Sequence, residues 1–391
     1  MRILFLSAWF PHPPSNGSRL RVSHLLRALA PRHEVALLSF ADQPDADPSA
    51  PALRALCRSV QVLPRPSFDP RAWRSRLALL GPRPRSLVAT FSPAMAGAVR
   101  RALAGGACDA VVASELACAA YAPWFGGAPA LFEDLELGAL HDQLTQAPRR
   151  WRAALMWAKH RRYLRGLLCH FRACTVVSES ERALLVGVLG GDRAIYVLPN
   201  GVAVAEYPAG GTAAEPDTVI FTGSLRYRPN YDAMRWFVGM VWPRVQRARP
   251  AARLLITGAH DDLPLPVATN VARSGFVDDV RPLLGAAWLA VAPIFAGGGT
   301  RVKILEAMAA GTPVVATAKG AEGLDAVAGE HLLIADEPAA FADHVIALLA
   351  DPARRARLAR AGRALVETRY DWRVLGPQFE SLLRAVATGS V

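Results

Sequence analysis

The sequence predicts an α/β protein of two domains, each built around a doubly wound parallel sheet. Its 391 residues are more than one hydrophobic core usually organises. Short apolar segments alternate with helical stretches nearly throughout, and the alternation stops once, at a stretch rich in Ala, Gly and Pro, before it restarts. We therefore expect an N-terminal domain at 1–202, a linker at 203–217, a C-terminal domain at 218–369 and a final helical segment at 370–391.

Short apolar segments bounded by turn residues mark the strands. In the first half we expect strands at Ile3–Ser7, Val35–Phe40, Val60–Leu63, Ala110–Ser114, Ala130–Phe132, Thr175–Ser178 and Tyr196–Leu198. In the second half we expect them at Val219–Thr222, Leu254–Thr257, Ser274–Val277, Leu289–Ala292, Val314–Thr317 and Leu332–Ile334. Open α/β sheets bind ligands at the carboxyl ends of their strands, so a ligand should lie there, between the two domains.

Composition limits the partners and the compartment. The formal net charge of +12 and the pI near 10.1 favour anionic partners such as nucleotides or phospholipids, although an Arg-rich coding bias would leave the same excess. No helix-turn-helix, zinc or RNA-binding motif accompanies the charge, so we expect no nucleic-acid partner. The five cysteines form no CxxC pair, the start MRILFLSAWFP suits a first strand better than a signal peptide, and no apolar run would span a bilayer. We expect a cytoplasmic protein, either free or peripheral on the inner membrane face.

A glycine-rich loop in the second half carries the clearest chemical signal. In FAGGGTRVKILEAMAAGTPVVAT, residues 295–317, three glycines follow a strand and precede a helix whose first turn holds Arg301 and Lys303. The exposed amides of such a loop bind anions, whereas two cations oppose the positive end of the helix dipole. A bound pyrophosphate resolves this conflict. The alternative is a surface ion pair between Lys303 and Glu306, which leaves the three glycines unexplained.

Four further segments accompany this loop, namely LPNGV (198–202), FTGSLRYRPNYDAMRWF (221–237), LLITG (254–258) and SGFVDDVRPLL (274–284). Together with PPSNGSRLRVSHLLRAL near the start, they resemble the family 4 group of GT-B glycosyltransferases over nearly the whole chain. The resemblance implies two Rossmann-like domains facing across a cleft, with the last helix crossing back to the first domain. It also implies transfer of a hexose-type sugar from a nucleotide-diphosphate sugar to a glycan, a lipid-linked glycan or a small molecule, with retention of anomeric configuration.

In this family the C-terminal domain holds the donor. The positions that match the donor site here are Gly223, Ser224, Arg226, Arg228, Gly258, Phe276, Val277, Gly297, Gly298, Gly299, Thr300, Arg301, Lys303 and Glu306. By this resemblance, Arg301 and Lys303 would stabilise the leaving diphosphate, and Glu306, which matches the second Glu of the family's E-x7-E motif, would contact the ribose. The backbone at Phe276–Val277 would read the nucleobase.

The chain departs from the family at two places in the donor site. Gly298 stands where a Glu near the donor sugar is common, and Ser224 and Pro229 stand where Arg and Lys are common. The phosphate charge would then have to be met by Arg226 or Arg228, or by Arg301 and Lys303 of the glycine-rich loop, and we favour the latter pair. These departures leave two alternatives open: an inactive pseudo-transferase that binds nucleotide sugars, and a GT-B sugar-nucleotide epimerase or hydrolase, for which no clear set of carboxylates or His is visible.

The acceptor side of the resemblance lies in the first half. Gly17, Ser18 and Arg19 match the family's acceptor-side loop, and basic residues at a helix start favour an anion there; a solvated helix start is the alternative. Glu133, in LFEDLEL, takes the place of a His that contacts the donor sugar in many relatives, which makes it the fourth catalytic candidate after the three residues of the C-terminal domain.

We expect neither a metal ion nor another cofactor. The DxD pair Asp45–Asp47 lies in a Pro-rich loop and suits a surface turn better than a metal site. No His or Cys residues have the spacing of metal ligands. The leaving diphosphate would instead be neutralised by the basic residues of the glycine-rich loop.

Residues 148–174, PRRWRAALMWAKHRRYLRGLLCHFRAC, combine many Arg with aromatic residues. At helical spacing they form two stripes, one with Trp151, Leu155, Ala158 and Arg162, the other with Leu164, Leu167, Leu168 and Phe171. A basic helix with aromatic anchors suits the surface of an anionic bilayer, and RAWRSR at 71–76 would add a second contact. The alternative is an ordinary domain helix whose apolar stripe is core.

Overall fold

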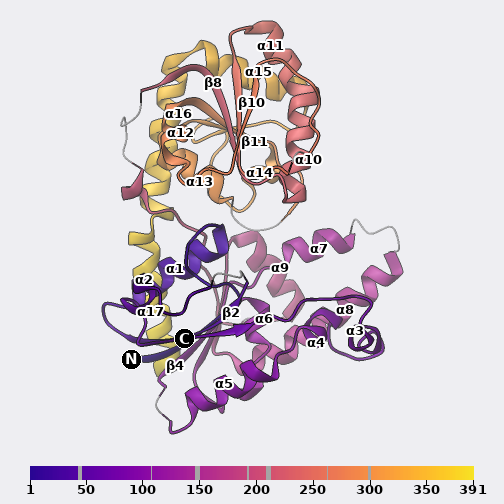
Figure 1. The fold of residues 1–391 in the computed structure, drawn as a ribbon, viewed down its shortest axis with the longest axis vertical. Helices are drawn as coiled ribbons and strands as arrows, with labels where there is room; N and C mark the ends of the chain where they lie inside the picture. The colour runs from indigo at the N-terminus through magenta and orange to yellow at the C-terminus, as the bar shows by residue number, and fades with distance from the viewer. Residues whose placement is uncertain are drawn as a thin grey trace. The chain divides into compact units, whose positions relative to one another are not determined.

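The computed structural model describes residues 1–42, 46–106, 108–145, 150–191, 193–207, 213–261, 263–297 and 301–391. These residues form two compact units (Figure 1). Unit 1 comprises Met1–Pro199 and Leu375–Val391, and unit 2 comprises Asn200–Val374. The first unit thus ends at Pro199 rather than at residue 202, and the segment predicted as a linker falls in unit 2, where its last residues already belong to a strand that begins at Glu215.

Unit 1 is built on a parallel sheet that has seven strands within the described residues, in the order β3-β2-β1-β4-β5-β6-β7. The strands are β1 (Arg2–Ser7), β2 (Glu34–Ala41), β3 (Ser59–Pro64), β4 (Ala110–Ser114), β5 (Ala130–Glu133), β6 (Ala173–Val176) and β7 (Ile195–Val197). Each overlaps a predicted strand. The largest displacement is at β6, which begins at Ala173 rather than Thr175 because the small buried residues Ala173 and Cys174 extend it backwards.

Helices cover this sheet, and their buried faces make the core of unit 1. They are α1 (Gly17–Leu29), α2 (Pro51–Arg54), α3 (Trp73–Leu77), α4 (Arg85–Ala89), α5 (Pro93–Leu103), α6 (Glu115–Ala119), α7 (Gly138–Thr145), α8 (Arg150–Leu167), α9 (Glu179–Leu189) and most of α17 (Trp372–Thr388). Helix α1 begins where it does because the Asn16 side chain accepts a hydrogen bond from the Arg19 amide and caps the helix. Gly17 and Ser18 are therefore its first residues and do not precede it.

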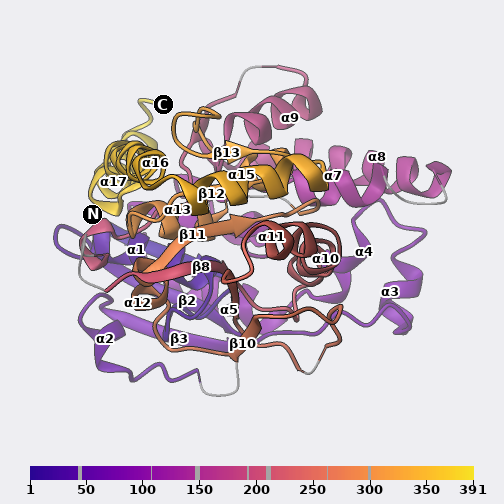
Figure 2. The ribbon, with the colours of Figure 1, turned by 90° about the horizontal axis from the view of Figure 1, so that it is seen from above.

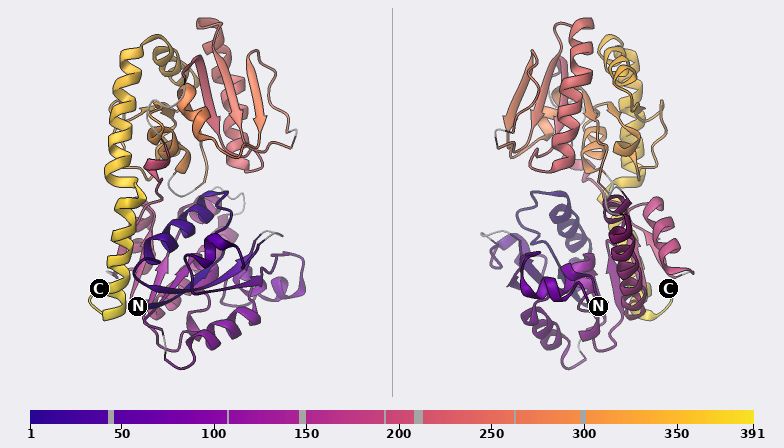
Figure 3. Two further views of the ribbon diagram at one scale, coloured as in Figure 1. Left: turned by 60° about the vertical axis from the view of Figure 1, so that its left-hand side comes forward. Right: turned by 90° about the vertical axis from the view of Figure 1, so that its right-hand side faces the viewer.

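Helix α17 packs along unit 1 from Leu375 onward. An added Cβ at Gly376 would lie 3.0 Å from the Cβ of Ala28 in α1. The carboxylate of Glu380 accepts hydrogen bonds from Arg32 at 2.8 Å and from the ring of His33 at 3.1 Å. Figure 3 shows this helix in yellow beside the indigo start of the chain. These are the contacts that the predicted return of the last helix to the first domain requires.

Unit 2 is built on a second parallel sheet, with six strands within the described residues in the order β10-β9-β8-β11-β12-β13. The strands are β8 (Glu215–Thr222), β9 (Arg253–Thr257), β10 (Val271–Gly275), β11 (Ala287–Ala292), β12 (Val314–Ala316) and β13 (Leu333–Ile334). The helices are α10 (Arg228–Trp236), α11 (Trp242–Ala248), α12 (Arg281–Ala286), α13 (Val302–Ala309), α14 (Ala318–Ala321), α15 (Pro338–Ala350) and α16 (Pro352–Leu365). β10 ends at Gly275, so Phe276 and Val277 follow the strand, contrary to the predicted strand at Ser274–Val277.

The alternation of side chains along β8 builds the two core layers of unit 2. Val219 and Phe221 join the layer formed with α10, α11 and α15, whereas Ile220 joins the layer formed with α12 and α13. Figure 2 shows the unit from above, with these helices around the strands. A sheet covered on both faces is the doubly wound arrangement that the sequence predicted, and it leaves the carboxyl edge of the strands for a binding site.

Candidate functional site

The segments that follow four neighbouring strands of unit 2 carry the predicted donor residues. Gly223 follows β8, Gly258 follows β9, Phe276 follows β10, and residues 293–297 follow β11 and lead towards α13. These strands are parallel neighbours, so their carboxyl ends lie at one edge of the sheet, which we call the donor edge. Three residues predicted for this site, Gly298, Gly299 and Thr300, lie outside the described residues.

Lys303 is a half-buried cation at the donor edge. It lies in the first turn of α13, and its Nζ atom donates a hydrogen bond to Asn230 Oδ1 at 2.8 Å and lies 4.1 Å from the centre of the Phe221 ring. Desolvation, together with the neighbouring charge of Arg301, lowers the pKa of Lys303 to about 7. An anion bound beside Lys303 would offset the positive charge of Arg301 and so stabilise the charged ammonium.

Asn230 positions Lys303 and was not among the predicted site residues. Its side chain is buried in the first turn of α10, where the amide nitrogen donates to the Ser224 carbonyl at 2.9 Å while the amide oxygen accepts from Lys303. One feature of the sequence could have indicated its role: Asn230 directly follows Pro229, the position at which the family commonly has Lys. Asn230 therefore joins the loop after β8 to the helix that carries the cation.

Gly223 and Gly258 are the positions where this edge requires glycine. Their φ angles of +134° and +108° are ones that other residues rarely adopt. A Cβ at Gly258 would lie 2.6 Å from the carbonyl carbon of Gly223, and one at Gly223 would lie 2.9 Å from the Nζ atom of Lys303. The loops after β8 and β9 therefore touch backbone to backbone, and the ammonium approaches the chain where a side chain would exclude it.

We expect Gly258→Ala to destabilise the protein more than Gly275→Ala. Both glycines have a positive φ, but an added Cβ meets nothing within 4 Å at Gly275. At Gly258 the same atom overlaps backbone that cannot move freely, which should add about 1–3 kcal/mol to the conformational strain. Chemical denaturation of the two variants measures the difference, and equal losses would contradict the backbone contact between the two loops.

Arg301 is the N-cap residue of α13 and folds back onto the glycine-rich loop. Its Nη2 atom donates hydrogen bonds to the carbonyl oxygens of Gly297 at 2.6 Å and Ala296 at 3.2 Å. Its charge contributes to the lowered pKa of Lys303, two positions further along the chain. The structure thus brings together the two basic residues that the loop sequence singled out.

The other two predicted cations are held by acidic side chains. Arg226 pairs with Asp261 at 2.5 Å, and Arg228 pairs with Asp232 at 2.7 Å. Both pairs are exposed, and such pairs contribute about 0–1 kcal/mol, so an incoming phosphate could displace them at little cost. In the structure as it stands, however, neither arginine supplies the positive charge that the missing Arg and Lys of the family pattern would have given.

Glu306 is half-buried one turn along α13 from Lys303. The hydroxyl of Tyr207 donates to its Oε1 atom at 3.2 Å. Desolvation raises the pKa of Glu306, partly offset by that hydrogen bond and by Lys303. The surface ion pair considered as an alternative is not formed, because Lys303 donates to Asn230 instead. Tyr207 was missed because it lies in the Ala- and Gly-rich stretch predicted as a linker.

Ser224 and the segment after β10 complete the described part of the donor edge. The hydroxyl of Ser224 donates to the Ala259 carbonyl at 3.2 Å, which ties the loop after β8 to the loop after β9. Phe276 is 66% exposed and Val277 is half-buried. Since both residues lie beyond the last ladder position of β10, their backbone is not used by the sheet, as the predicted reading of a base by this backbone requires.

Unit 1 carries a buried ion pair at the carboxyl ends of β4 and β5. Arg21 and Glu133 are 2% and 0% exposed, and Arg21 Nε donates to Glu133 Oε1 at 2.6 Å. Ser114 Oγ donates to the other oxygen of Glu133, also at 2.6 Å. The remaining nitrogens of Arg21 donate to the carbonyl oxygens of Leu198 and Pro199 at 3.0 Å. Glu133 would therefore have to exchange one of these partners to contact a sugar, as its predicted catalytic role requires.

Two further carboxylates flank this pair and were not predicted. Glu115 directly follows β4, Asp134 directly follows β5, and both have the left-handed backbone conformation, with φ of 63° and 59°. The indole nitrogen of Trp9 donates to Glu115. Burial raises the pKa of Asp134, and burial together with the charge of Asp134 raises the pKa of Glu115 to about 8. We call Glu115, Glu133 and Asp134 the carboxylate cluster.

We expect Glu115 to make the protein less stable as the pH rises towards 9. Its pKa of about 8 in the folded protein exceeds the ordinary value of 4.5, so the native state holds a proton that the unfolded state has released in this window. The bound proton contributes its full stabilisation below the pKa that Glu115 has in the unfolded chain. This stabilisation is lost as the pH rises through about 8. The melting temperature of Glu115→Gln relative to wild type should therefore rise by a few degrees between about pH 5 and pH 9. A pH-independent difference would contradict the proposed titration.

The basic start of α1 is neutralised by the protein itself. Arg19 pairs with Asp42, with 2.5 Å between Nη2 and Oδ2, and Arg21 pairs with Glu133. Both acidic side chains are nearly inaccessible to solvent. Arg19 is therefore already paired within the protein, and the binding of an external anion beside it stays a prediction. Gly17 and Ser18 lie in the first turn of α1, and a role in binding the acceptor stays a prediction for them.

Within the described ranges, no three His, Cys, Asp or Glu side chains converge in a way that could hold a metal ion. Of the DxD pair, Asp45 lies outside the described residues. Asp47 accepts hydrogen bonds from the amide and the hydroxyl of Ser49, at 2.8 and 2.6 Å, and so forms the local turn expected of it.

Two family models match the chain. One, described as Glycosyltransferase Family 4, matches residues 15–206, and the other, described as Glycosyl transferases group 1, matches residues 216–351. The first therefore covers most of unit 1 and the carboxylate cluster, and the second covers the donor edge of unit 2.

Two curated relatives are mannosyltransferases. The phosphatidyl-myo-inositol mannosyltransferase of Mycobacterium leprae is 33% identical over 230 residues, which are 54% of this chain and 59% of that protein. The GDP-mannose-dependent monoacylated alpha-(1-6)-phosphatidylinositol monomannoside mannosyltransferase of Corynebacterium glutamicum is 31% identical over 158 residues, 37% of this chain and 42% of that protein. The matches thus span less than two thirds of the length of these relatives.

Solved structures share the fold at low sequence identity. Sucrose-phosphate synthase from Thermosynechococcus elongatus has a TM-score of 0.74 at 18% identity and is matched over 100% of both chains. The Anabaena protein HepE, solved in complex with UDP and glucose, has a TM-score of 0.68 at 18% identity over 98% of this chain and 100% of its own.

Two doubly wound parallel-sheet units, shared with these solved structures, define the GT-B fold. The predicted fold class is confirmed. One family model matches each unit, and together the two models give the family. This chain belongs to the family 4-like glycosyltransferases of the GT-B fold.

Proposed function

We propose that this protein transfers a hexose-type sugar from a nucleotide-diphosphate sugar to an acceptor, with retention of anomeric configuration. The observation that carries the proposal is the donor edge, where Arg301, Lys303 and Glu306 meet two loops that approach each other through Gly223 and Gly258. Two further facts support it: curated relatives are named mannosyltransferases, and HepE has been solved with UDP and with UDP-glucose.

The donor diphosphate would lie against Arg301 and Lys303, at the start of α13. Negative charge develops on the leaving phosphate as the sugar–phosphate bond breaks, and cations already in place stabilise it without reorganisation. Two cations supply this charge, so we propose that no metal ion or other cofactor is needed. Glu306 would accept a hydrogen bond from a ribose hydroxyl, and the backbone at Phe276–Val277 would lie beside the base.

The reaction itself needs no protein nucleophile. The acceptor hydroxyl attacks the anomeric carbon from the face that the diphosphate leaves, so the new bond forms as the old one breaks and the configuration is kept. The departing phosphate oxygen takes the hydroxyl proton. In unit 1, Asp134 Oδ1 is buried without a hydrogen-bond partner among the described residues, so we propose that it, beside the engaged Glu133, accepts a hydrogen bond from the acceptor.

Incubation with UDP-, GDP-, ADP- and TDP-sugars and candidate acceptors tests the proposed activity. We expect transfer from one donor, a product with the donor's anomeric configuration by proton NMR, and no loss of rate in EDTA. A donor that binds but is neither transferred nor hydrolysed would favour the pseudo-transferase, and an epimerised sugar would favour the epimerase. An inverted product would contradict the same-face mechanism.

We also propose a lipid-linked acceptor and a peripheral place on the cytoplasmic face of a membrane. The first predicted stripe of α8 is exposed, with Trp151 at 65% and Leu155 at 53%, whereas the second stripe, with Leu164 and Leu168, is buried in the core of unit 1. Exposed apolar groups of this size, set among arginines, favour an anionic bilayer. None of the helices in the described residues combines the length and apolar character needed to cross a membrane.

Trp151→Ser/Leu155→Ser should weaken binding to vesicles that contain phosphatidylglycerol by about tenfold, since each side chain loses part of the roughly 1.5–3 kcal/mol available on full burial. The matched control is Met240→Ser/Val267→Ser, which removes two exposed apolar side chains from unit 2. Co-sedimentation measures both variants. Equal binding by the two variants would show that α8 does not carry the contact.

A further inference from the structure

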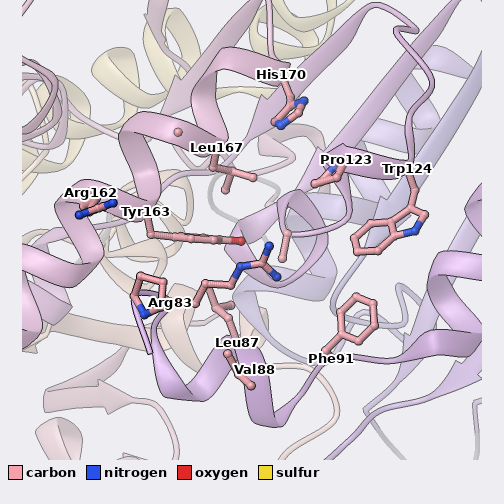
Figure 4. Close-up of a pocket in the computed structure, with 13 residues that line it drawn as sticks. Arg83, Leu87, Val88, Phe91, Pro123, Trp124, Arg162, Tyr163, Leu167 and His170 are labelled. Carbon is pink, nitrogen blue, oxygen red and sulfur yellow. The ribbon is translucent and has the colours of Figure 1, made fainter. Parts of the chain in front are cut away.

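A pocket of about 450 Å³ lies in unit 1 between α4, α8 and the turn after α6 (Figure 4). This volume is within the range of about 300–1,000 Å³ usual for small-molecule sites. Its apolar wall is formed by Leu87, Val88, Phe91, Trp124, Tyr163 and Leu167. The pocket shares no lining residue with the donor edge or with the carboxylate cluster.

The charged residues of this pocket are all basic. Arg83, Arg162 and His170 line it, and no acidic side chain is among the described residues that do so. Figure 4 shows the guanidinium of Arg83 reaching into the pocket beside the hydroxyl end of Tyr163. Arg83 and Arg162 have neither a hydrogen bond nor an ion pair with any described residue, whereas Arg19, Arg21, Arg226 and Arg228 are each paired with a carboxylate.

Exposed apolar residues of unit 1 lie close in sequence to the lining of the pocket. Leu79 and Leu80, 50% and 91% exposed, are separated from the lining residue Pro82 by Gly81 alone. Helix α8 carries Arg162 in the pocket wall and Trp151 on the exposed stripe, and Lys159 of the same helix donates a hydrogen bond to the Leu79 carbonyl. The pocket and the proposed membrane contact therefore share helix α8.

We propose that this pocket binds one anionic lipid of the bilayer, with the end of a hydrocarbon chain against the apolar wall and the phosphate at the guanidinium of Arg83, while Arg162 adds positive charge to the wall. An apolar wall alone would suit many uncharged ligands. Arginines that have no hydrogen bond or ion pair with a described residue select an amphiphile with an anionic head, since arginine binds phosphate through charge-assisted, bidentate hydrogen bonds. The proposal rests on the proposed membrane surface but not on sugar transfer.

Titration of the full chain with hexyl, octyl and decyl phosphate, each below its critical micelle concentration, tests the pocket without a membrane. We expect the affinity to rise about threefold to fourfold for each added methylene until the pocket is filled, and then to level off. Alkyl phosphocholines of the same chain lengths should bind at least about tenfold more weakly. Inorganic phosphate should show no measurable binding, which distinguishes a lipid site from a phosphate site.

Two variants locate the binding. Val88→Trp fills the pocket and should abolish binding of octyl phosphate, and Arg83→Gln/Arg162→Gln should weaken it at least about tenfold. Both arginines are exposed, so the double variant remains a test if Val88→Trp fails to fold. The control is Arg357→Gln/Arg360→Gln on α16, which removes two exposed arginines from unit 2.

The outcomes separate this proposal from the proposed function. The pocket variants should bind nucleotide-diphosphate sugars as wild type does, and they should still bind vesicles through Trp151 and Leu155. If octyl phosphate binds wild type and Val88→Trp equally, or fails to bind while vesicle binding persists, the pocket is not a lipid site. Binding that depends on the chain but is equal for phosphate and phosphocholine would overturn the role of the two arginines.

Discussion

Replacing Lys303 by Met should weaken binding of the nucleotide-diphosphate sugar by about 100-fold. Met keeps the length of the side chain and its packing on Phe221, so the change removes the charge and the hydrogen bond to Asn230. A charge-assisted hydrogen bond contributes about 1.5–3 kcal/mol, which corresponds to roughly 10- to 150-fold in affinity. We expect the loss of affinity at Lys303 to lie near the upper end of this range, because the surroundings of its ammonium group are already partly desolvated.

The same residue should make donor binding depend on pH. In the free protein the pKa of Lys303 is about 7, and a bound diphosphate should raise it, so binding takes up a proton above pH 7. The affinity should therefore fall between about pH 7 and pH 9, by at most tenfold per pH unit. The nucleotide sugar is the right probe because its diphosphate, esterified at both ends, does not titrate in this range.

Isothermal titration at several pH values, in buffers of different ionisation enthalpy, measures both the affinity and the proton uptake. The control is Lys319→Met, which removes a lysine of α14 whose partner Glu322 lies at the surface, and it should bind like wild type. Lys303→Met should show a flat pH profile. A wild-type affinity that does not change with pH would contradict the assignment of Lys303 to the diphosphate.

Replacing Arg21 by Met should have the largest effect on stability, a loss of about 3–5 kcal/mol in the free energy of unfolding. Glu133 is 0% exposed, and without Arg21 its charge would be left with the Ser114 hydroxyl as its remaining hydrogen-bond donor of those described above. An isolated buried carboxylate is costly, so the variant should bind a proton at this site or lose the local structure at the ends of β4 and β5.

A second substitution separates the loss of charge balance from the loss of packing. Glu133→Gln in the Arg21→Met background removes the stranded charge and should restore a large part of the stability, so that the two changes are strongly non-additive. The control is Arg32→Met, because Arg32 is 67% exposed in its pair with Glu380 and should cost less than about 1 kcal/mol. Urea denaturation measures all four proteins. Additive effects at Arg21 and Glu133 would contradict the buried pair.

The strands could be predicted because each is a local apolar segment between turns. Every predicted strand overlaps an observed one, and Ala110–Ser114 was predicted with its observed bounds. The errors also come from reading local apolar segments as strands. β10 has the weakly apolar sequence VARSG at the edge of its sheet, so the strand was predicted too late, at the more hydrophobic Phe276 and Val277. A local pattern cannot tell an exposed edge strand from the apolar residues that follow it.

The candidate site could be predicted only in part, because its important contacts join distant segments. The glycine-rich loop pointed to Arg301 and Lys303 on local grounds. Asn230, which positions Lys303, lies 73 residues away in sequence, and Tyr207, which contacts Glu306, lies 99 residues away. Such partners are brought together by the order of strands in the sheet, which no local pattern contains.

The carboxylate cluster shows the same limit in unit 1. The basic start of α1 was expected to face an external anion, but its residue Arg21 is neutralised by Glu133, 112 positions away. Glu115 and Asp134 belong to the site through their left-handed backbone after β4 and β5, a conformation that is uncommon for non-glycine residues and that composition does not reveal. In each case the charge of the side chain is evident from the sequence, whereas its partner depends on the fold.

The donor edge should bind the diphosphate of a sugar nucleotide. Thermal shift of wild type and of Arg301→Ala/Lys303→Ala, with UDP, GDP, ADP, TDP and their sugars, measures this binding. We expect one nucleotide to raise the melting temperature of wild type and to leave that of the variant unchanged, which would also identify the base. An equal rise in both proteins would contradict the claim, because it would place the nucleotide away from these two cations.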